Sequence, residues 1–383
     1  MLVLLFVVVA GLYLLDRYCT KHAFDDISYD IQSNRKLVEI GEDISLETTI
    51  INAGRLPISF LKTGEILPDC ISLRDVSTEL TPTQRGAAFV SETFLMPRQQ
   101  LVRTVKATLP RRGRYYLIGA TLTAGGFLGL SEKSEEFHLL REIVLIPKTV
   151  ATPRLNKMLG RFIGDVSINR FTLEDPILTI GFRDYTDRDP MRSISWKQTA
   201  RFGKLMVKNF DHTLDLSVTV IVNAELKSGE PEKELEALFS LARTVCEFLE
   251  DSETPYRFIT NVTTVDGTGS KSIIPDGLGP EHLVAILELL GRATYHYFES
   301  FVEIIAKTAR SAEQGRAHIL LTPDVQPEVT PYIHKLRART GRDVMVITPE
   351  LAEDIDAADE VAAETRHHDG TNRDDTADVA KTA

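Results

Sequence analysis

The first fifteen residues, MLVLLFVVVAGLYLL, are almost wholly apolar and constrain the fold more than any other stretch. They lack the basic start and the small-residue cleavage site of a secretory signal. At 1.5 Å per residue they span about 23 Å, and extension through Cys19 brings a helix closer to the roughly 30 Å of a hydrocarbon core. We therefore expect a transmembrane anchor over residues 1–19; the alternative is a buried strand or helix of a soluble domain.

The charges that flank this run favour one orientation in the membrane. Arg17 and Lys21 follow it, and only the amino terminus is positive before it. The positive-inside rule then leaves the rest of a single-pass protein in the cytoplasm. The three cysteines, Cys19, Cys70 and Cys246, are widely spaced and show no metal-binding pattern, which agrees with a reducing compartment.

The negative charge of the chain is concentrated at its C-terminal end. The net charge is −11, and residues 350–383 contain eleven acids and three bases, a net of −8, which leaves −3 for the rest. A nearly balanced body gives no reason to expect nucleic acid as a partner. The segment 351–383 has no aromatic residue, so we expect a disordered acidic tail, either a passive solubilising segment or a docking segment.

Residues 24–147 carry the pattern of a β-rich domain. Between residues 44 and 50 apolar and polar side chains alternate, which is the period of a half-buried strand, and turn residues flank this segment. Seven short strands at such spacing predict an immunoglobulin-like β-sandwich. The expected strands are 28–33, 44–50, 59–66, 89–94, 102–109, 115–123 and 137–146.

Two loops of this domain contain residues that bind anions in other contexts. The glycines of segment 125–130 could suggest a phosphate cradle, but no helix follows them, so we expect a turn between strands. Arg111, Arg112 and Arg114 form a small basic cluster. We expect it at a solvated hairpin end, with contact to lipid headgroups as the alternative.

Residues 155–350 alternate between strand and helix patterns, which predicts a doubly wound, mostly parallel sheet. The apolar run 214–222 is typical of a buried central strand, and 205–210 is expected to be its antiparallel hairpin partner. The other expected strands are 257–263, 319–321 and 344–347, and the expected helices are 233–249, 281–290, 298–312 and 328–339.

Polar residues follow two of these strands, where ligands of open α/β sheets usually bind. Asn223, Glu225 and Asp324 could each offer an oxygen atom to a hard cation. The alternative is that they cap loops. No nucleophile elbow, H-E-x-x-H or Walker A pattern occurs in the chain, so the sequence predicts no catalytic residue and no cofactor.

Segment 182–210 surrounds the only tryptophan of the chain with opposite charges. In one interpretation, arginines pair with aspartates and Trp196 packs between the two domains as a rigid junction. In the other, the same residues face outward and form a docking surface, because Trp and Arg are favoured anchors of protein interfaces. The candidate residues are Arg183, Asp184, Tyr185, Asp189, Arg192, Trp196 and Arg201.

This segment resembles the signature of the bacterial family catalogued as domain of unknown function fifty-eight, R-E-Y-x-x-G-D-x-x-R-x-I-x-W-x-x-S-A-R followed by L-x-V. Weaker likenesses upstream, at 112–115 and 127–130, extend the resemblance to roughly residues 1–350. Three positions depart from the signature: Asp184 replaces Glu, Arg188 replaces Gly, and Thr199 replaces Ser. The matching positions are Arg183, Tyr185, Asp189, Arg192, Ile194, Trp196, Ala200, Arg201, Leu205 and Val207.

The resemblance implies a fold and a role. It implies a von Willebrand factor A-like fold for the α/β domain, in which D-x-S-x-S after the first strand can hold a divalent cation. Segment 223–227 lacks both serines, so we expect no competent metal site. It also implies a membrane-anchored scaffold or adaptor, without enzymatic activity, that works with a MoxR-type AAA+ ATPase in the assembly of protein complexes. The alternatives are an enzyme of envelope metabolism with an unrecognised site at the strand ends, and a divalent-metal-dependent adhesion module.

Overall fold

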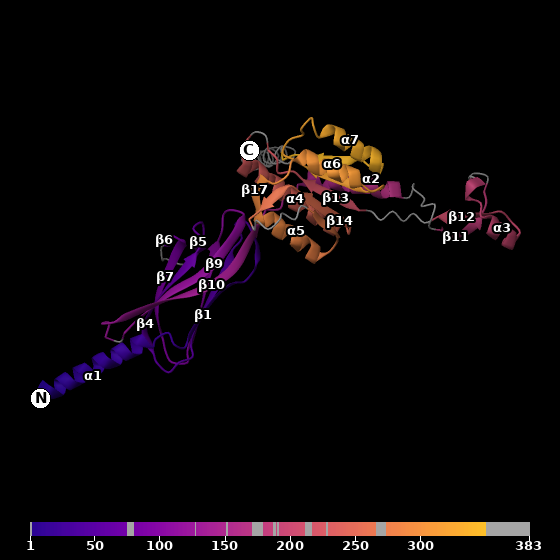
Figure 1. Cartoon of the computed structure of the whole chain (residues 1–383). Helices are drawn as coiled ribbons and strands as arrows, with labels where there is room; N and C mark the ends of the chain where they lie inside the picture. Colours follow the sequence, from indigo (N-terminus) through magenta and orange to yellow (C-terminus); the bar gives the residue numbers. More distant parts are fainter. Residues whose placement is uncertain are drawn as a thin grey trace, which may run out of the picture. The chain divides into compact units, whose positions relative to one another are not determined.

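A computed structural model gives the structure of the chain (Figure 1). The acidic tail expected over 351–383 lies outside the described residues, as do Asp187, Arg188 and Lys227. The chain divides into two compact units, a β unit of residues 1–148 with 287–293 and an α/β unit of residues 149–286 with 294–383. The structure describes residues 2–74, 80–126, 128–150, 152–170, 179–186, 189, 191–210, 217–226, 229–265 and 273–349.

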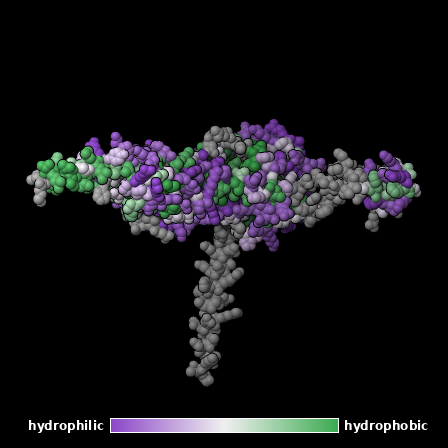
Figure 2. Space-filling view, turned by 90° about the horizontal axis from the view of Figure 1, so that it is seen from below, coloured by the Kyte–Doolittle hydropathy of each residue, from purple (hydrophilic) through white to green (hydrophobic). Residues whose placement is uncertain are grey.

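Helix α1 (Leu2–Lys21) opens the β unit and is long and apolar enough to cross a membrane. Most of its apolar side chains are exposed, and Figure 2 shows their surface in green. Its last turns differ, because Asp16 and Thr20 are buried against the rest of the unit. The helix α1 is thus long and apolar, with its C-terminal end fixed in the β unit.

Two antiparallel sheets build the rest of the β unit. One has the order β1-β3-β8-β5 and the other β2-β10-β9-β4-β7-β6, in which the β2–β10 pair is parallel. All seven expected strands are confirmed, as β1, β3, β4, β7, β8, β9 and β10. The strands are β1 (Ile27–Ser33), β2 (Leu37–Glu39), β3 (Ile44–Asn52), β4 (Ile58–Leu67), β5 (Ser72–Arg74), β6 (Thr81–Thr83), β7 (Gly86–Leu95), β8 (Gln100–Thr108), β9 (Gly113–Gly125) and β10 (Glu132–Ile146).

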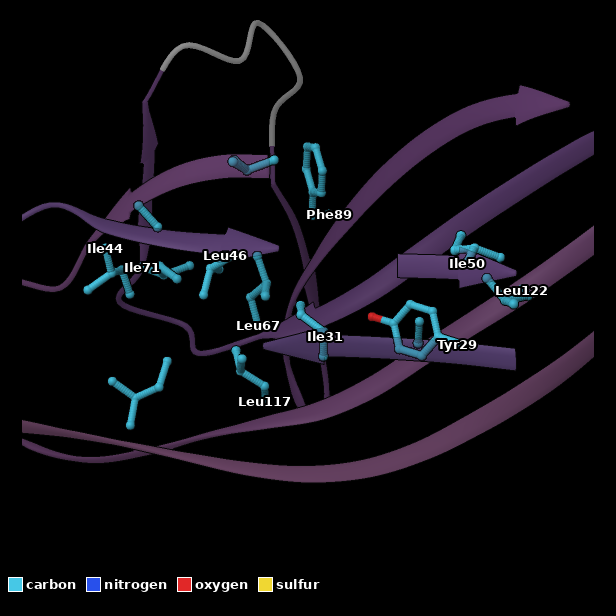
Figure 3. Close-up of a cluster of buried hydrophobic side chains, with 14 of the residues drawn as sticks. Tyr29, Ile31, Ile44, Leu46, Ile50, Leu67, Ile71, Phe89, Leu117 and Leu122 are labelled. Atoms are coloured by element: carbon cyan, nitrogen blue, oxygen red, sulfur yellow. The ribbon is translucent and has the colours of Figure 1, made fainter. Parts of the chain in front are cut away.

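Both sheets contribute to one apolar core, so together they form a two-sheet sandwich. Strand β3 buries every second side chain, as its alternating sequence predicts. Ile31 and Leu46 from one sheet and Leu117 and Leu122 from the other belong to the same buried cluster (Figure 3). The period-two pattern of β3 therefore predicted which of its faces turns inward.

The α/β unit contains a five-stranded sheet of order β16-β14-β13-β18-β19, parallel except for the edge strand β16. The mostly parallel sheet expected from the sequence is confirmed. All residues of the central strand are buried. The strands are β13 (Val218–Val222), β14 (Tyr256–Thr260), β16 (Ile273–Gly277), β18 (Ala317–Leu321) and β19 (Val344–Ile347).

Helices cover this sheet. Helix α4 (Pro231–Asp251) lies against β13 and β18, and α2 (Pro153–Arg170) packs on α4. Helices α6 (Phe301–Ser311) and α7 (Thr330–Thr340) share a core with β13, β14 and β18. Helix α5 (Pro280–Arg292) follows β16, and its residues from Leu287 onward belong to the β unit. Strands β15 (Val262–Thr264) and β17 (Ala293–Tyr297) form a two-stranded sheet.

One expected pairing is wrong. Strand β12 (Met206–Phe210) does not pair with β13; it forms an antiparallel hairpin with β11 (Thr179–Asp184). The reason is that β13 is the central strand, and its two edges are already occupied by β14 and β18. The hairpin carrying the charged segment is therefore a separate two-stranded sheet.

Candidate functional sites

The described residues from 179 to 210 form a small module, which we call the signature module. Between β11 and β12 lie a short 3-10 turn, Met191–Ser193, and helix α3 (Trp196–Phe202). Gly203 ends this helix in the left-handed conformation, with φ of 69°. The module has a small interior made of Ser193, Ile194, Ser195, Met206 and Val207.

Its charges are paired at the surface. Arg183 donates from both terminal nitrogens to Asp189, at 2.7 and 2.5 Å, and Thr186 donates to the same carboxylate from its N–H and its hydroxyl. These bonds, among which those from Arg183 have the largest effect, hold the pKa of Asp189 well below its usual range. Asp184 pairs with Lys204, 2.8 Å away, rather than with an arginine. Arg201 is exposed, Tyr185 is half-buried, and the side chain of Arg192 lies outside the described residues.

Large apolar side chains of the module face solvent. The residue Trp196 is 67% exposed, although the junction interpretation requires a buried indole ring. The short helix that bears it buries none of its residues. Unpaired apolar surface on so small a module is typical of a binding surface rather than of an interior. The exposed set is Phe182, Met191, Trp196, Phe202 and Leu205.

At the carboxyl ends of β13, β14 and β18, buried polar side chains form a closed network. Asn261 accepts a hydrogen bond from the N–H of Ala224 at 2.7 Å and donates to the side-chain oxygen of Asn223 at 3.2 Å. Asn223 in turn donates to the hydroxyl of Thr322 at 3.0 Å. That hydroxyl donates to the backbone carbonyl of Asp324 at 2.6 Å. The network joins the loops that follow three strands.

The residues considered for a cation reach this edge of the sheet but have other partners. The carboxylate of Glu225 accepts hydrogen bonds from the N–H of Phe301 at 2.7 Å and the hydroxyl of Ser300 at 3.3 Å. It therefore caps the N-terminus of α6, where a negative charge is favourable. The side chain of Asp324 is exposed. Among the described residues, no group of three or more His, Cys, Asp or Glu side chains is placed to hold a metal.

Sequence reasoning missed Asn261, because it fell inside a strand expected over 257–263. The structure ends β14 at Thr260 and begins β15 at Val262, so Asn261 occupies the break. A polar amide between two β-branched apolar stretches was the available signal. Ser300 was also missed, because it fell inside the helix expected over 298–312, whereas α6 begins at Phe301 and Ser300 is its N-cap.

The C-terminal end of α1 is fixed to the turn between β9 and β10. Asp16 is 2% exposed, and its carboxylate accepts hydrogen bonds from the N–H of Leu128 at 2.7 Å and the hydroxyl of Ser131 at 2.8 Å. Ser131 also contacts the hydroxyl of Thr20 at 2.9 Å. A side chain at Gly126 would overlap the Asp16 carboxylate, so a glycine is required there. The turn expected from the glycines is confirmed, and it holds a carboxylate of its own chain.

We expect Asp16→Ala to loosen this turn without unfolding the sandwich. The N–H of Leu128 and the hydroxyl of Ser131 would lose a charged acceptor, and such bonds contribute about 1.5–3 kcal/mol. Hydrogen exchange of the Leu128 amide in bilayer-embedded protein should then accelerate roughly tenfold or more. Ser131→Ala, which leaves the Leu128 bond in place, is the matched control and should have a smaller effect. Equal exchange in Asp16→Ala and the unaltered chain would contradict this role.

The basic cluster at 111–114 is not a solvated hairpin end. Arg112 is buried and donates to the carbonyl oxygens of Leu290 and Ala293, at the C-terminal end of α5. Arg114 pairs with Glu142 at 2.7 Å. The expectation failed because sequence spacing does not indicate that carbonyls about 180 residues away need donors. Contact of this cluster with lipid headgroups is also disfavoured, because Arg112, its central arginine, is buried and bound to these carbonyls.

A cavity of about 260 Å³ lies near the amino ends of the strands of the α/β unit. His318 lines it and is almost fully buried, with its Nδ1 atom unpartnered. Burial, and the nearby positive charge of Arg316, lower the pKa of His318 to about 4. Arg316 itself is bound to Asp276 at 2.5 Å, and Asp276 also binds Arg257 at 2.6 Å. The walls of the cavity thus carry the neutral imidazole of His318 and two arginines, Arg257 and Arg316, that are both paired with Asp276.

Comparisons with known proteins give no family match. A scan of family models and a search of curated proteins each returned no match. A cohesin module of a Clostridium perfringens family 33 glycoside hydrolase aligns with a TM-score of 0.24 and 13% identity, over 31% of this chain and 96% of the module. A CARDB domain from Pyrococcus furiosus gives 0.20 and 12%, over 31% and 92%. The sporulation control protein of Bacillus subtilis gives 0.18 and 12%, over 42% and 58%. Scores this low support no argument about fold or function.

Proposed function

We propose that the chain is a membrane-anchored scaffold or adaptor that recognises another protein through its signature module. The observation that carries the proposal is the exposed apolar surface around Trp196, on a module in which both described aspartates, Asp184 and Asp189, are paired with basic side chains. Aromatic anchors surrounded by paired charges are typical of protein interfaces. No chemical step is needed for this role.

The contacts of α1 support an anchor rather than a removable leader. Asp16 and Thr20 of the helix are built into the β unit by three hydrogen bonds with the β9–β10 turn. A leader peptide that is removed would not need these bonds, nor a glycine at position 126 that leaves room for the Asp16 carboxylate. We infer that α1 stays attached and that the two units lie in the cytoplasm, as the flanking Arg17 and Lys21 favour.

The finer assignments belong to the same proposal. The two-sheet sandwich is consistent with an immunoglobulin-like domain. The mostly parallel sheet with helical cover is consistent with a von Willebrand factor A-like domain, and the sequence of the signature module supports membership of the family of domain of unknown function fifty-eight. The partner that this family resemblance favours is a MoxR-type AAA+ ATPase.

The test is binding of a MoxR-type ATPase from the same genome to the full chain in bilayers. Trp196→Ala should weaken binding roughly 30-fold or more, since truncating an anchor residue costs about 2 kcal/mol. Lys208→Ala, also exposed and on β12 of the same module, is the matched control and should bind nearly normally. Circular dichroism should be unchanged in both variants, because neither side chain is buried.

Two results would argue against the proposal. If no ATPase of this type binds the unaltered chain, the partner is wrong. If it binds and Trp196→Ala has no effect, the signature module is not the binding surface.

The alternative functions have less support. An enzyme would best use the cavity beside His318, and turnover of a small molecule lost in His318→Gln would favour it. A metal-dependent adhesion module would need Glu225 as a ligand, but that carboxylate is engaged at the N-terminus of α6.

A further inference from the structure

The end of the β unit nearest α1 can be located by hydrogen bonds and strand register; we call it the α1 end. The β9–β10 turn lies beside α1, because Leu128 and Ser131 bind Asp16. Strand pairing then places the start of β4 and the end of β7 alongside, since Phe60 is opposite Gly125 and Ile58 is opposite Leu95. The side chain of Asn52 binds the carbonyl of Met96 at 3.1 Å, which adds the turn 96–99 and the end of β3.

Exposed apolar side chains gather at this end. Outside α1, the described part of the β unit exposes eight large apolar residues, and all but Leu140 lie at the α1 end or within four residues of it along a strand. Single exposed apolar residues are normal on a soluble surface, but their confinement to one end marks an interaction surface. The seven residues are Ile51, Phe60, Phe94, Met96, Val102, Leu128 and Leu130.

An apolar cavity of about 220 Å³ lies between α1 and this end. Its walls include Leu12 and Leu15 of the helix and Pro57, Ile58 and Leu128 of the β unit. Leu12 precedes Asp16 by one helical turn, so the sheet end flanks a part of α1 that belongs to its apolar run. If that run lies in a bilayer, the end of the sandwich reaches the depth of the bilayer interface.

Basic residues sit in the same turns as the apolar ones. Arg55 is exposed in the turn before β4, and Arg98 is exposed in the turn between β7 and β8. Arginine near an apolar surface can bind lipid phosphates while its stem stays in contact with the apolar region. The buried Arg112, by contrast, belongs to the opposite end of β9, close to Gly113.

We propose that the α1 end of the β unit inserts into the bilayer interface, with its apolar side chains against lipid acyl chains and Arg55 and Arg98 at headgroup phosphates. The inference rests on the proposed membrane anchor and extends it. The β unit is then a second membrane-binding element, held at a fixed height by Asp16 rather than suspended from α1.

Tryptophan fluorescence in vesicles with brominated acyl chains tests this, because bromine quenches only indoles that reach it. The full chain carries Trp196→Phe as a background, and vesicles contain phosphatidylcholine and phosphatidylglycerol. Leu130→Trp should lose most of its emission. Leu140→Trp is a matched control, since both leucines are highly exposed, at 66% and 70%, and Leu140 lies ten residues further along the same hairpin. Its emission should be unchanged.

A third variant, Val9→Trp in α1, separates the two proposals. If Val9→Trp is quenched and Leu130→Trp is not, the anchor stands and the insertion of the β unit is overturned. If Val9→Trp is not quenched, the anchor itself fails and the inference fails with it. Equal quenching of Leu130→Trp and Leu140→Trp would mean that the sheet lies flat on the membrane, which also overturns end-on insertion.

Discussion

Asn261→Ala is expected to destabilise the α/β unit by about 3 kcal/mol, because it removes three hydrogen bonds, at about 0.5–1.5 kcal/mol each, and takes the acceptor from the buried N–H of Ala224. The side chain serves the N–H of Ala224, the amide oxygen of Asn223 and the carbonyl of Glu299. Asn261 is fully buried, so bulk water does not replace these bonds.

Hydrogen exchange along β13 and β14, followed against denaturant, measures the loss within the α/β unit alone. Ser252→Ala is the control in the same unit, because Ser252 is exposed and its hydroxyl donates one hydrogen bond to the carbonyl of Phe248. It should cost less than about 1 kcal/mol. A similar small loss for Asn261→Ala would mean that the network does not hold the strand ends together.

Gly119→Ala is expected to disrupt the β unit at least as severely. Gly119 lies within β9 with φ of 125°, a conformation that side-chain-bearing residues rarely adopt. A Cβ atom there would overlap the backbone carbonyl of Phe137, next to the irregularity in β10 between His138 and Arg141. Backbone strain of this kind costs about 1–3 kcal/mol before any overlap is relieved.

The measurement is the thermal unfolding of the full chain in lipid, with hydrogen exchange of β9 and β10. Gly64→Ala is the matched control on the neighbouring strand β4, where a Cβ atom would meet only Thr121 O at an ordinary 3.7 Å. It should be tolerated. If both variants unfold alike, the glycine at 119 is not required by its conformation.

The sequence predicted the long elements well because each contains its own signal. Strand β3 alternates over nine residues, and the apolar face of α4 repeats from Leu235 to Leu249, about four turns. Strands of three residues, such as β2 and β5, are too short to display a period. Helix α2 was missed although its signal was present: Leu155, Leu159 and Ile163 recur every four residues and are buried.

The candidate sites were harder to predict because their partners are distant in sequence. Asp16 is 112 residues from Leu128, and Arg112 is 178 residues from Leu290. No pattern near Asp16 indicated that its carboxylate holds this turn. For Trp196, composition identified an unusual residue, but only its exposure favours a binding surface over packing.

The position of Glu225 limits how this sheet edge can change. Its carboxylate accepts a hydrogen bond from the first N–H group of α6. If Glu225 instead bound calcium or magnesium, that helix would lose its cap. Restoring hydroxyl groups nearby would not be enough, because the protein would have to exchange one stabilising role for another in the same step. An engineer seeking a cation switch here must first give α6 a new cap, for example by replacing Ser300 with aspartate.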